Sequence, residues 1–223
     1  MLSIAIDGPA GAGKSTIAKE VAKRLGYIYV DTGALYRAIG LYFLKNNISL
    51  SDFSSINQTL SKIDINMQFK NQEQRVFLCG EDVSEQIRTN EVSMLASKVS
   101  SFPEIREFLL NLQRDLAKKD NVIMDGRDIG TVVLPNADVK IFLTAKPEKR
   151  ATRRYAELID KGIQCDYNQV LTEIITRDHN DSTRTIAPLK PAKDSILVDT
   201  TDLDLQAAIL NIENIILQNI NKN

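Results

Sequence analysis

Short apolar runs alternate with longer amphipathic stretches over most of the chain. Runs rich in β-branched or aromatic residues predict four buried strands, and a fifth is expected at residues 27–30. The four lie at residues 2–6, 122–124, 139–143 and 196–198. Apolar residues spaced three and four apart predict helices within residues 17–25, 35–43, 105–116 and 205–216. Because strands alternate with helices, the pattern favours an α/β fold whose parallel sheet has helices on both faces.

The ends of the predicted helices have recognisable residues. Gly26 suits the position just past the end of the first helix, and Pro103 suits the start of the third. Asp202 or Asp204 is expected to cap the last helix, because a short carboxylate accepts hydrogen bonds from the free N–H groups of a first turn.

Two segments interrupt the alternation. Residues 62–90 contain INMQF and RVFLCG around the polar NQEQ, which predicts a β-hairpin or a small three-stranded insert. Residues 146–185 are rich in Arg, Lys and Asp, and they predict helices that are largely solvated.

Composition limits the class of protein. The chain has 223 residues, 43% hydrophobic and 26% charged, which is ordinary for a soluble fold with a sizeable core. Its 28 basic and 29 acidic residues give a net charge of -1, so no bulk basic field exists to hold nucleic acid. No apolar run approaches the roughly 18–20 residues that span a bilayer. Cys79 and Cys165 are read as free thiols, and we expect a cytoplasmic monomer.

A glycine-rich stretch after the first predicted strand fits the phosphate-binding-loop pattern. It comprises Gly8, Pro9, Ala10, Gly11, Ala12, Gly13, Lys14 and Ser15, followed by Thr16. Glycines let backbone N–H groups turn toward phosphate oxygens, and the start of the following helix adds positive potential. We expect the loop to bind ATP, with Lys14 at the β- and γ-phosphates and the Ser15 hydroxyl on Mg²⁺. Asp7, just before the loop, is expected to organise it.

Arginines gather after the predicted strands in clusters at residues 31–37, 125–128 and 177–184. A kinase whose acceptor is itself phosphorylated must hold two highly charged groups together, and planar guanidinium groups suit phosphate oxygens. Because α/β sites form at the carboxyl ends of strands, the clusters indicate such an acceptor.

The chain resembles bacterial cytidylate kinases along essentially its whole length. The matching stretches are IDGPAGAGKST, DTGALYRAIG, GEDVSEQIRT, ASKVSSFPEIRE, MDGRDIGTVVLPNADVKIFL and RDHNDSTRTIAPL. The resemblance implies a nucleoside monophosphate kinase fold: a five-stranded parallel sheet flanked by helices, with a small β-rich insert and a helical lid. The single domain 1–223 would have a core of residues 1–61, 91–145 and 186–223, an acceptor-side insert at about 62–90 and a lid at about 146–185.

The resemblance also implies an activity and a set of site residues. The γ-phosphoryl group of ATP would pass to CMP or dCMP, giving CDP or dCDP and ADP. Ser97, Arg106 and Asp128 match positions that contact cytosine. The positions around the acceptor nucleotide and its phosphate match Thr32, Arg37, Arg127 and Arg184. Arg177 and Asp181 match positions near the ribose, and Arg177 is also close to the transferring group.

The catalytic set implied is Lys14, Arg127, Arg177 and Arg184. Because some relatives have glycine at the position of Ser15, Thr16 is the alternative metal ligand. No general base is required, since the acceptor phosphate is already an anionic nucleophile.

The chemistry of cytosine agrees with this assignment. An Asp accepts from the 4-amino group, and an Arg donates to the neighbouring acceptors. Asp128 and Arg106 therefore argue against UMP, dTMP, AMP or shikimate as the acceptor. A nucleotide-dependent switch is the remaining alternative, but the guanine-reading Asn-Lys-x-Asp motif is missing from the sequence.

The sequence gives less specific expectations for the remaining polar residues. Asp125 is expected either in the second shell of the metal or as a cap of the strand end. His179, the only histidine, is expected on a solvated helix face. Arg150, Arg153 and Arg154 lie either on such a face or over bound ATP, and we expect at least one contact with ATP.

Overall fold

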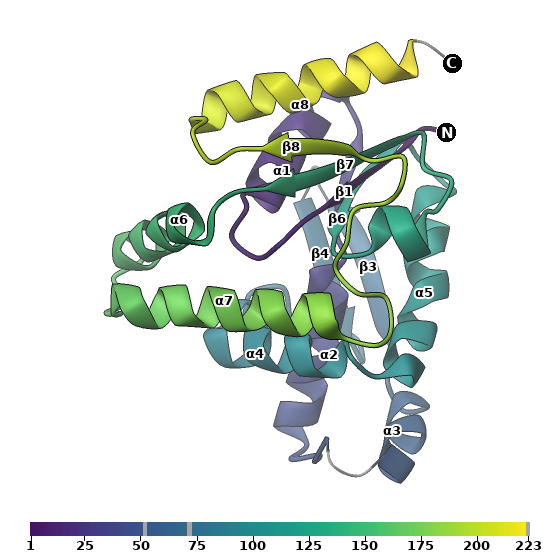
Figure 1. Ribbon diagram of the computed structural model, residues 1–223. Coiled ribbons are helices and arrows are strands. Elements are labelled where there is room, and N and C mark those ends of the chain that lie inside the picture. The colour runs from purple at the N-terminus through teal and green to yellow at the C-terminus, as the bar shows by residue number, and fades with distance from the viewer. Residues whose placement is uncertain (51–52, 71–72, 222–223) are drawn as a thin grey trace.

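The computed structural model describes residues 1–50, 53–70 and 73–221, drawn in Figure 1. Within these residues a parallel sheet of five strands runs in the order β2-β6-β1-β7-β8. The strands are β1 (Ser3–Asp7), β2 (Ile28–Asp31), β6 (Val122–Gly126), β7 (Val139–Thr144) and β8 (Ile196–Asp199). All five predicted strands are confirmed, with ends shifted by one or two residues.

Helices cover both faces of this sheet, as expected. Ile4 and Ile6 of β1 are fully buried against α1 (Lys14–Leu25) and α8 (Leu205–Ile220). Ala5, between them, faces the opposite cluster, which includes α2 (Gly33–Lys45) and α5 (Pro103–Ala117). A strand buried on both faces is apolar at successive positions, which explains why these strands read as continuous runs.

The predicted helix ends are also found. Gly26 ends α1 in the left-handed conformation with φ 70°, and Pro103 occupies the first turn of α5. Asp204, not Asp202, caps α8 by accepting the Ala207 N–H at 2.7 Å.

Two helices were not predicted from the sequence. They are α3 (Phe53–Leu60) and α4 (Asn90–Val99). Val92, Leu95, Ala96 and Val99 of α4 lie at positions i, i+3, i+4 and i+7, a helical spacing that was not recognised in the sequence. The helix packs closely on α2, where a Cβ on Gly40 would lie 3.2 Å from Leu95 Cβ.

The β-rich insert is present as an antiparallel sheet in the order β3-β4-β5 within the described residues. The strands are β3 (Ile65–Lys70), β4 (Glu73–Leu78) and β5 (Glu81–Asp82), followed by the short helix η1 (Gln86–Arg88). Residues 71 and 72 of the polar NQEQ stretch lie outside the described residues. Met67 and Val76 pair across β3 and β4 and belong to the same core cluster as α2, so the insert shares the main core.

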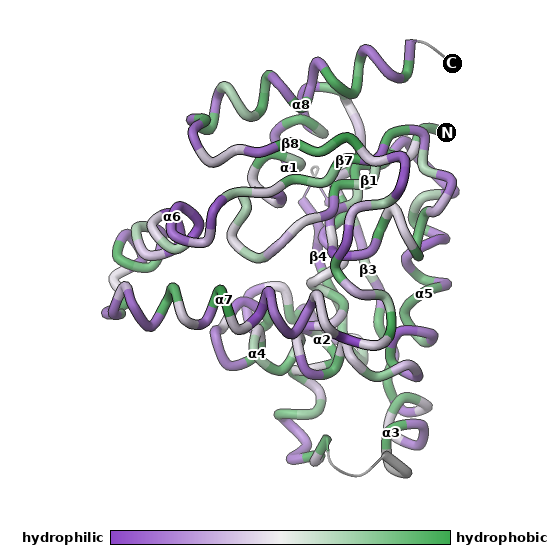
Figure 2. The backbone as a smooth tube through the Cα atoms, in the orientation of Figure 1, coloured by the Kyte–Doolittle hydropathy of each residue, from purple (hydrophilic) through white to green (hydrophobic). Residues whose placement is uncertain are grey.

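The basic segment forms two adjacent helices, α6 (Pro147–Asp160) and α7 (Tyr167–Thr183), which lie to one side of the sheet in Figure 1. Hydrophilic and hydrophobic positions alternate along α7 in Figure 2, and His179 is exposed there, as predicted. Ala151, Val170 and Ile174 form a small core between the helices. The helical expectation is confirmed, but Arg150 and Asp181 are buried, so the segment is less solvated than its composition indicates.

Cys79 and Cys165 are free, as expected. Among residues 1–50, 53–70 and 73–221, no helix is both long and apolar enough to cross a membrane.

Candidate active site

A cleft of about 890 Å³ lies at the carboxyl ends of the parallel strands. Its lining comes from the loop after β1, from the ends of β2 and β6, and from α1, α2, η1, α4, α5, α6, α7 and the start of α8. Most predicted site residues line it. They are Ala10, Gly11, Gly13, Lys14, Ser15, Thr16, Thr32, Arg37, Ser97, Arg106, Arg127, Asp128, Arg177, Asp181 and Arg184.

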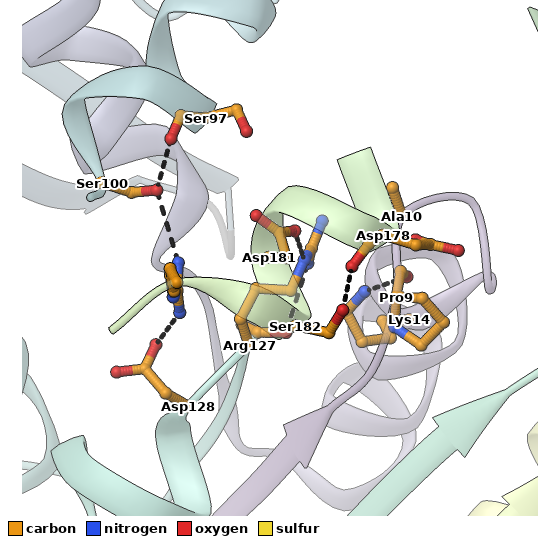
Figure 3. Close-up of polar contacts among 12 residues, drawn as sticks. Pro9, Ala10, Lys14, Ser97, Ser100, Arg127, Asp128, Asp178, Asp181 and Ser182 are labelled. Atoms are coloured by element: carbon orange, nitrogen blue, oxygen red, sulfur yellow. Dashed lines mark hydrogen bonds and ion pairs between the residues drawn. The ribbon is translucent and has the colours of Figure 1, made fainter. Parts of the chain in front are cut away.

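The glycine-rich loop connects β1 to α1, the context that a phosphate cradle requires. Gly8 has φ 150°, and a Cβ there would lie 1.9 Å from the carbonyl oxygen of Leu143, so only glycine fits. Lys14 is 5% exposed, and its Nζ donates to the Pro9 carbonyl oxygen at 2.8 Å, as Figure 3 shows. Burial and the nearby Arg127 lower the pKa of Lys14 to about 7. An anionic ligand beside Lys14 would favour its charged form and so raise this pKa.

A buried carboxylate lies beside the loop. The Ser15 hydroxyl donates to Oδ2 of Asp125 at 2.8 Å, and the Tyr29 hydroxyl donates to Oδ1 at 3.2 Å. Burial and the neighbouring Asp31 raise the pKa of Asp125 to about 6. The Asp125 side chain is therefore directed at Ser15 and does not cap the strand end.

Asp7 acts on a different loop from the one expected. Its carboxylate accepts the backbone N–H groups of Ile129 and Gly130, at 2.7 and 2.8 Å. These residues begin a single π-helical turn, η2 (Ile129–Val133), directly after Asp128. Asp7 thus links the strand before the phosphate cradle to the turn that places Asp128.

Cations and hydroxyls predicted for the acceptor gather in the middle of the cleft. Arg37 pairs with Asp31 at 2.5 Å, and the Thr32 hydroxyl donates to the Asp125 carbonyl oxygen at 2.8 Å. Arg127 donates to Asp181 at 2.9 Å, also drawn in Figure 3.

The guanidinium of Arg177 stands out among the cations of the cleft. Within the described residues its Nε is buried without a hydrogen-bond partner. Burial and Arg127 lower the pKa of Arg177. A buried donor with no partner beside a second guanidinium favours an anionic ligand at this point.

The far end of the cleft holds a buried charged pair. Nη2 of Arg106 is paired with Oδ2 of Asp128, and the side chains are 9% and 7% exposed. Arg106 also donates to the Ser100 carbonyl oxygen at 3.1 Å and lies 5.5 Å from the ring centroid of Tyr36. Nη2 of Arg184 lies 3.5 Å from the other carboxylate oxygen of Asp128. Ser97 lines the cleft next to this group.

The three arginines of α6 have separate roles. Arg150 is 3% exposed and donates to the carbonyl oxygens of Ala10 and Ala145 at 2.8 and 2.7 Å and to Asp178 at 2.5 Å. It therefore ties α6 and α7 to the phosphate cradle and lies neither on a solvated face nor in the lining of the cleft. Arg153 and Arg154 do line the cleft.

Sequence reasoning passed over several side chains of the cleft, among them Tyr36 and Arg88. Tyr36, which lies under Arg106, is within the DTGALYR stretch, and Arg88 is within GEDVSEQIRT. Both stretches were noted for other residues, so the signal was present in the sequence.

Comparison with known proteins gives a consistent result. The sequence model of the family described as cytidylate kinase matches residues 4–222. A cytidylate kinase of Caldicellulosiruptor bescii is 56% identical over 211 residues, covering 95% of this chain and 93% of the relative. One of Carboxydothermus hydrogenoformans is 51% identical over 215 residues, covering 96% and 97%. A solved structure of an uncharacterized protein from Eubacterium ventriosum superposes with a TM-score of 0.52 at 13% identity over the full length of both chains, a similarity of fold alone.

Proposed function

The chain belongs to the cytidylate kinase family, and we propose how the residues of its cleft perform that family's reaction. The protein is an ATP-dependent kinase that phosphorylates CMP or dCMP and releases CDP or dCDP with ADP. An oxygen of the acceptor phosphate attacks the γ-phosphorus, and the bond from that phosphorus to the β–γ bridging oxygen breaks.

The donor phosphates bind in the glycine-rich loop. Backbone N–H groups of the loop after Pro9, at residues 10–13, and the start of α1 would face the phosphate oxygens, and Lys14 would lie between the β- and γ-phosphates. The charge of the phosphates restores the full protonation of Lys14, whose pKa of about 7 in the free protein reflects burial beside Arg127.

Ser15 and Asp125 fit a Mg²⁺ ion. Their oxygens lie 2.8 Å apart beside the cradle. Burial and the neighbouring Asp31 raise the pKa of Asp125, and a cation at this point would favour its charged form. Among the described residues no group of three or more His, Cys, Asp or Glu could hold a metal, which suits an ion held mainly by substrate phosphates and water. Ser15 is favoured over Thr16 because Ser15 is the residue bonded to Asp125. When bound, the ion supplies charge neutralisation between the two nucleotides.

The acceptor phosphate lies among Arg37, Arg127 and Arg177, with the Thr32 hydroxyl beside them. The partnerless Nε of Arg177 supports this position, because a phosphate oxygen there would satisfy it. Arg127 and Asp181 hold each other in place near the ribose. Catalysis is positioning plus neutralisation of the charge that develops during transfer.

The base is read at the far end of the cleft by Arg106, Asp128 and Ser97. The buried Arg106–Asp128 pair is the single observation on which this assignment depends. It offers an acceptor for the 4-amino group of cytosine and a donor for its ring nitrogen and carbonyl. Uracil would oppose its own carbonyl to the Asp128 carboxylate.

The segment of α6 and α7, residues 146–185, is the lid in this proposal. Arg153 and Arg154 are the residues of α6 that would meet ATP when it closes. We also propose that the protein acts as a monomer in the cytoplasm, where nucleotide pools are formed.

Acceptor profiling tests the proposal directly. Coupled ADP release is measured with ATP and Mg²⁺ and, in turn, with CMP, dCMP, UMP, AMP, GMP and dTMP. We expect CMP and dCMP to give the highest kcat/KM. Equal or higher values with a purine nucleotide would overturn the assignment of the base site, and ADP release without any acceptor would favour a nucleotide-dependent switch.

A further inference from the structure

The end of β2 lies at an open edge of the central sheet. This strand is the first in the order β2-β6-β1-β7-β8, so one of its sides has no neighbour in that sheet. Asp31 is its last residue, and the acceptor-side residues Thr32 and Arg37 follow directly. Exposed backbone groups at such an edge need partners if the chain is to keep one conformation.

A side chain from the insert supplies these partners. The Asp31 N–H donates to Oε1 of Gln74 at 2.7 Å, and Nε2 of Gln74 donates to the Asp31 carbonyl oxygen at 3.2 Å. Gln74 lies in β4, so one amide group pairs with the backbone of β2 as a neighbouring strand would. Because Gln74 accepts one of these bonds and donates the other, the two bonds fix both the position and the orientation of the Asp31 backbone.

Asp31 in turn holds the acceptor side of the cleft. Its Oδ2 is 2.5 Å from Nη2 of Arg37, and its Oδ1 accepts the Ala34 N–H at 3.1 Å in the first turn of α2. Burial alone would raise the pKa of Asp31, yet Arg37 beside it keeps the pKa below its usual value. A shift of the Asp31 backbone would therefore move the Arg37 guanidinium and the start of α2 together.

The same insert borders the acceptor side at a second point. Arg88 of η1 lines the cleft, and its Nε donates to the Ser84 carbonyl oxygen at 3.1 Å. The positive charge of Arg88 also contributes to the lowered pKa of Asp31. Two separate residues thus connect the insert to the acceptor side of the cleft.

We propose that Gln74 is a positioning residue for the acceptor phosphate, through which the β-rich insert sets the Asp31–Arg37 pair. The inference rests on the proposed binding of that phosphate at Arg37. Gln74 itself touches neither nucleotide. Removing its amide should weaken the binding of every pyrimidine acceptor by the same factor, because the base is read at the far end of the cleft, by Arg106 and Asp128.

The test replaces Gln74 by Met, which has similar length but offers no amide. Losing the paired bonds at a half-buried site should raise KM for CMP about tenfold. KM for UMP should rise by the same factor, and KM for ATP should stay unchanged. A matched control is Glu73→Gln on the neighbouring residue, whose ion pair with Lys19 is 4.0 Å long and 59% exposed at both ends.

A second variant separates the inference from the proposed function. Arg37→Gln should raise KM for CMP, and Gln74→Met should add little to it, since Gln74 acts through Arg37. If Arg37→Gln leaves KM for CMP unchanged, the proposed place of the acceptor phosphate is wrong.

If Arg37→Gln raises that KM but Gln74→Met behaves as Glu73→Gln does, the role of Gln74 is refuted. Equal increases in KM for ATP and CMP, with a lower Tm, would likewise refute positioning and show a purely structural role. Should Gln74→Met fail to fold, Gln74→Asn keeps the amide on a side chain too short to bridge both groups and carries the same expectations.

Discussion

Asp128→Asn tests base recognition at its centre. The Asp128 side chain is 7% exposed and faces two arginines with its two carboxylate oxygens. Oδ2 is ion-paired with Arg106, whereas Oδ1 is 3.5 Å from Nη2 of Arg184. Because Oδ1 is held less tightly, we expect it to accept the hydrogen bond from the 4-amino group of cytosine.

The size of the effect follows from what each base presents. Asparagine keeps an oxygen for Arg106 but turns its amide nitrogen toward the base, where it repels an amino group and can donate to the carbonyl of uracil. Loss of a buried hydrogen bond to a charged group costs about 1–3 kcal/mol, so the preference for CMP over UMP should shrink about 10- to 100-fold in kcat/KM.

Asparagine is the informative substitution at this position. Both alanine and asparagine remove the charge that faces Arg106 and Arg184, but alanine also removes the acceptor of Arg106 in a buried site. Its cost of about 3–5 kcal/mol in stability would confuse folding with recognition. With asparagine, the assay is coupled ADP release with CMP and UMP at saturating ATP, together with thermal unfolding.

A control makes the same chemical change away from the cleft. Asp194→Asn removes the 2.7 Å ion pair with Lys140, a cation whose side chain is 8% exposed. It should leave the ratio of kcat/KM for CMP and UMP unchanged. If Asp128→Asn lowered kcat/KM for both nucleotides by one common factor, Asp128 would be a structural or catalytic residue and this account of base choice would be refuted.

Three further predictions concern the phosphate-binding loop, the lid and the buried carboxyl group of Asp7. Lys14→Ala should lower kcat at least about 100-fold in the ADP-release assay while Tm is retained, and normal turnover would contradict the ATP site. ATP analogue plus CMP should protect residues 146–185 from limited proteolysis, because closure excludes water from the transfer site; identical cleavage with and without nucleotides would contradict a lid. Burial raises the pKa of Asp7 from 3.8 to about 6, so the native state holds this proton more tightly than the unfolded state does. The stability that Asp7 contributes is thus present below its unfolded pKa and is lost as pH rises through about 6. In urea unfolding, the free energy of unfolding of the wild type minus that of Asp7→Asn should fall by roughly 3 kcal/mol between about pH 4 and about pH 7, and a constant difference would refute the raised pKa.

The strands of the sheet and the phosphate cradle could be predicted because each is encoded by a short continuous stretch of sequence. Strands buried on both faces appear as apolar runs, and the loop of residues 8–15 is contiguous. Helix α4 was missed although Val92, Leu95, Ala96 and Val99 have helical spacing, because the stretch is only 10 residues long and polar residues separate its apolar positions.

The contacts that organise the site escaped for a different reason. They join residues far apart in the chain: Gln74 and Asp31 are separated by 43 positions, Asp7 and Ile129 by 122, and Arg150 and Ala10 by 140. In each contact a side chain bonds to a backbone group. Only one of the two partners is therefore a residue type that a sequence pattern can identify. Arg150 was consequently placed with Arg153 and Arg154, either on a solvated face or over bound ATP.

Three neighbouring strands of the sheet each have a carboxylate at the last or next-to-last residue, although the cleft must receive two polyanions. Asp7 of β1 holds the turn after Asp128, Asp31 of β2 holds Arg37, and Asp125 of β6 holds the Ser15 hydroxyl. The acids thereby fix the groups that will meet the substrates, and they offset cations that would otherwise repel one another.

That compensation is incomplete in the free protein. The pKa of Lys14 is lowered by burial and Arg127, and the pKa of Arg177 is lowered by the same two causes. Burial is the main cause in both cases, and the positive charge of Arg127 adds to it. In the proposed mechanism the binding of phosphate supplies negative charge beside these two cations, and transfer to an anionic acceptor requires no general base.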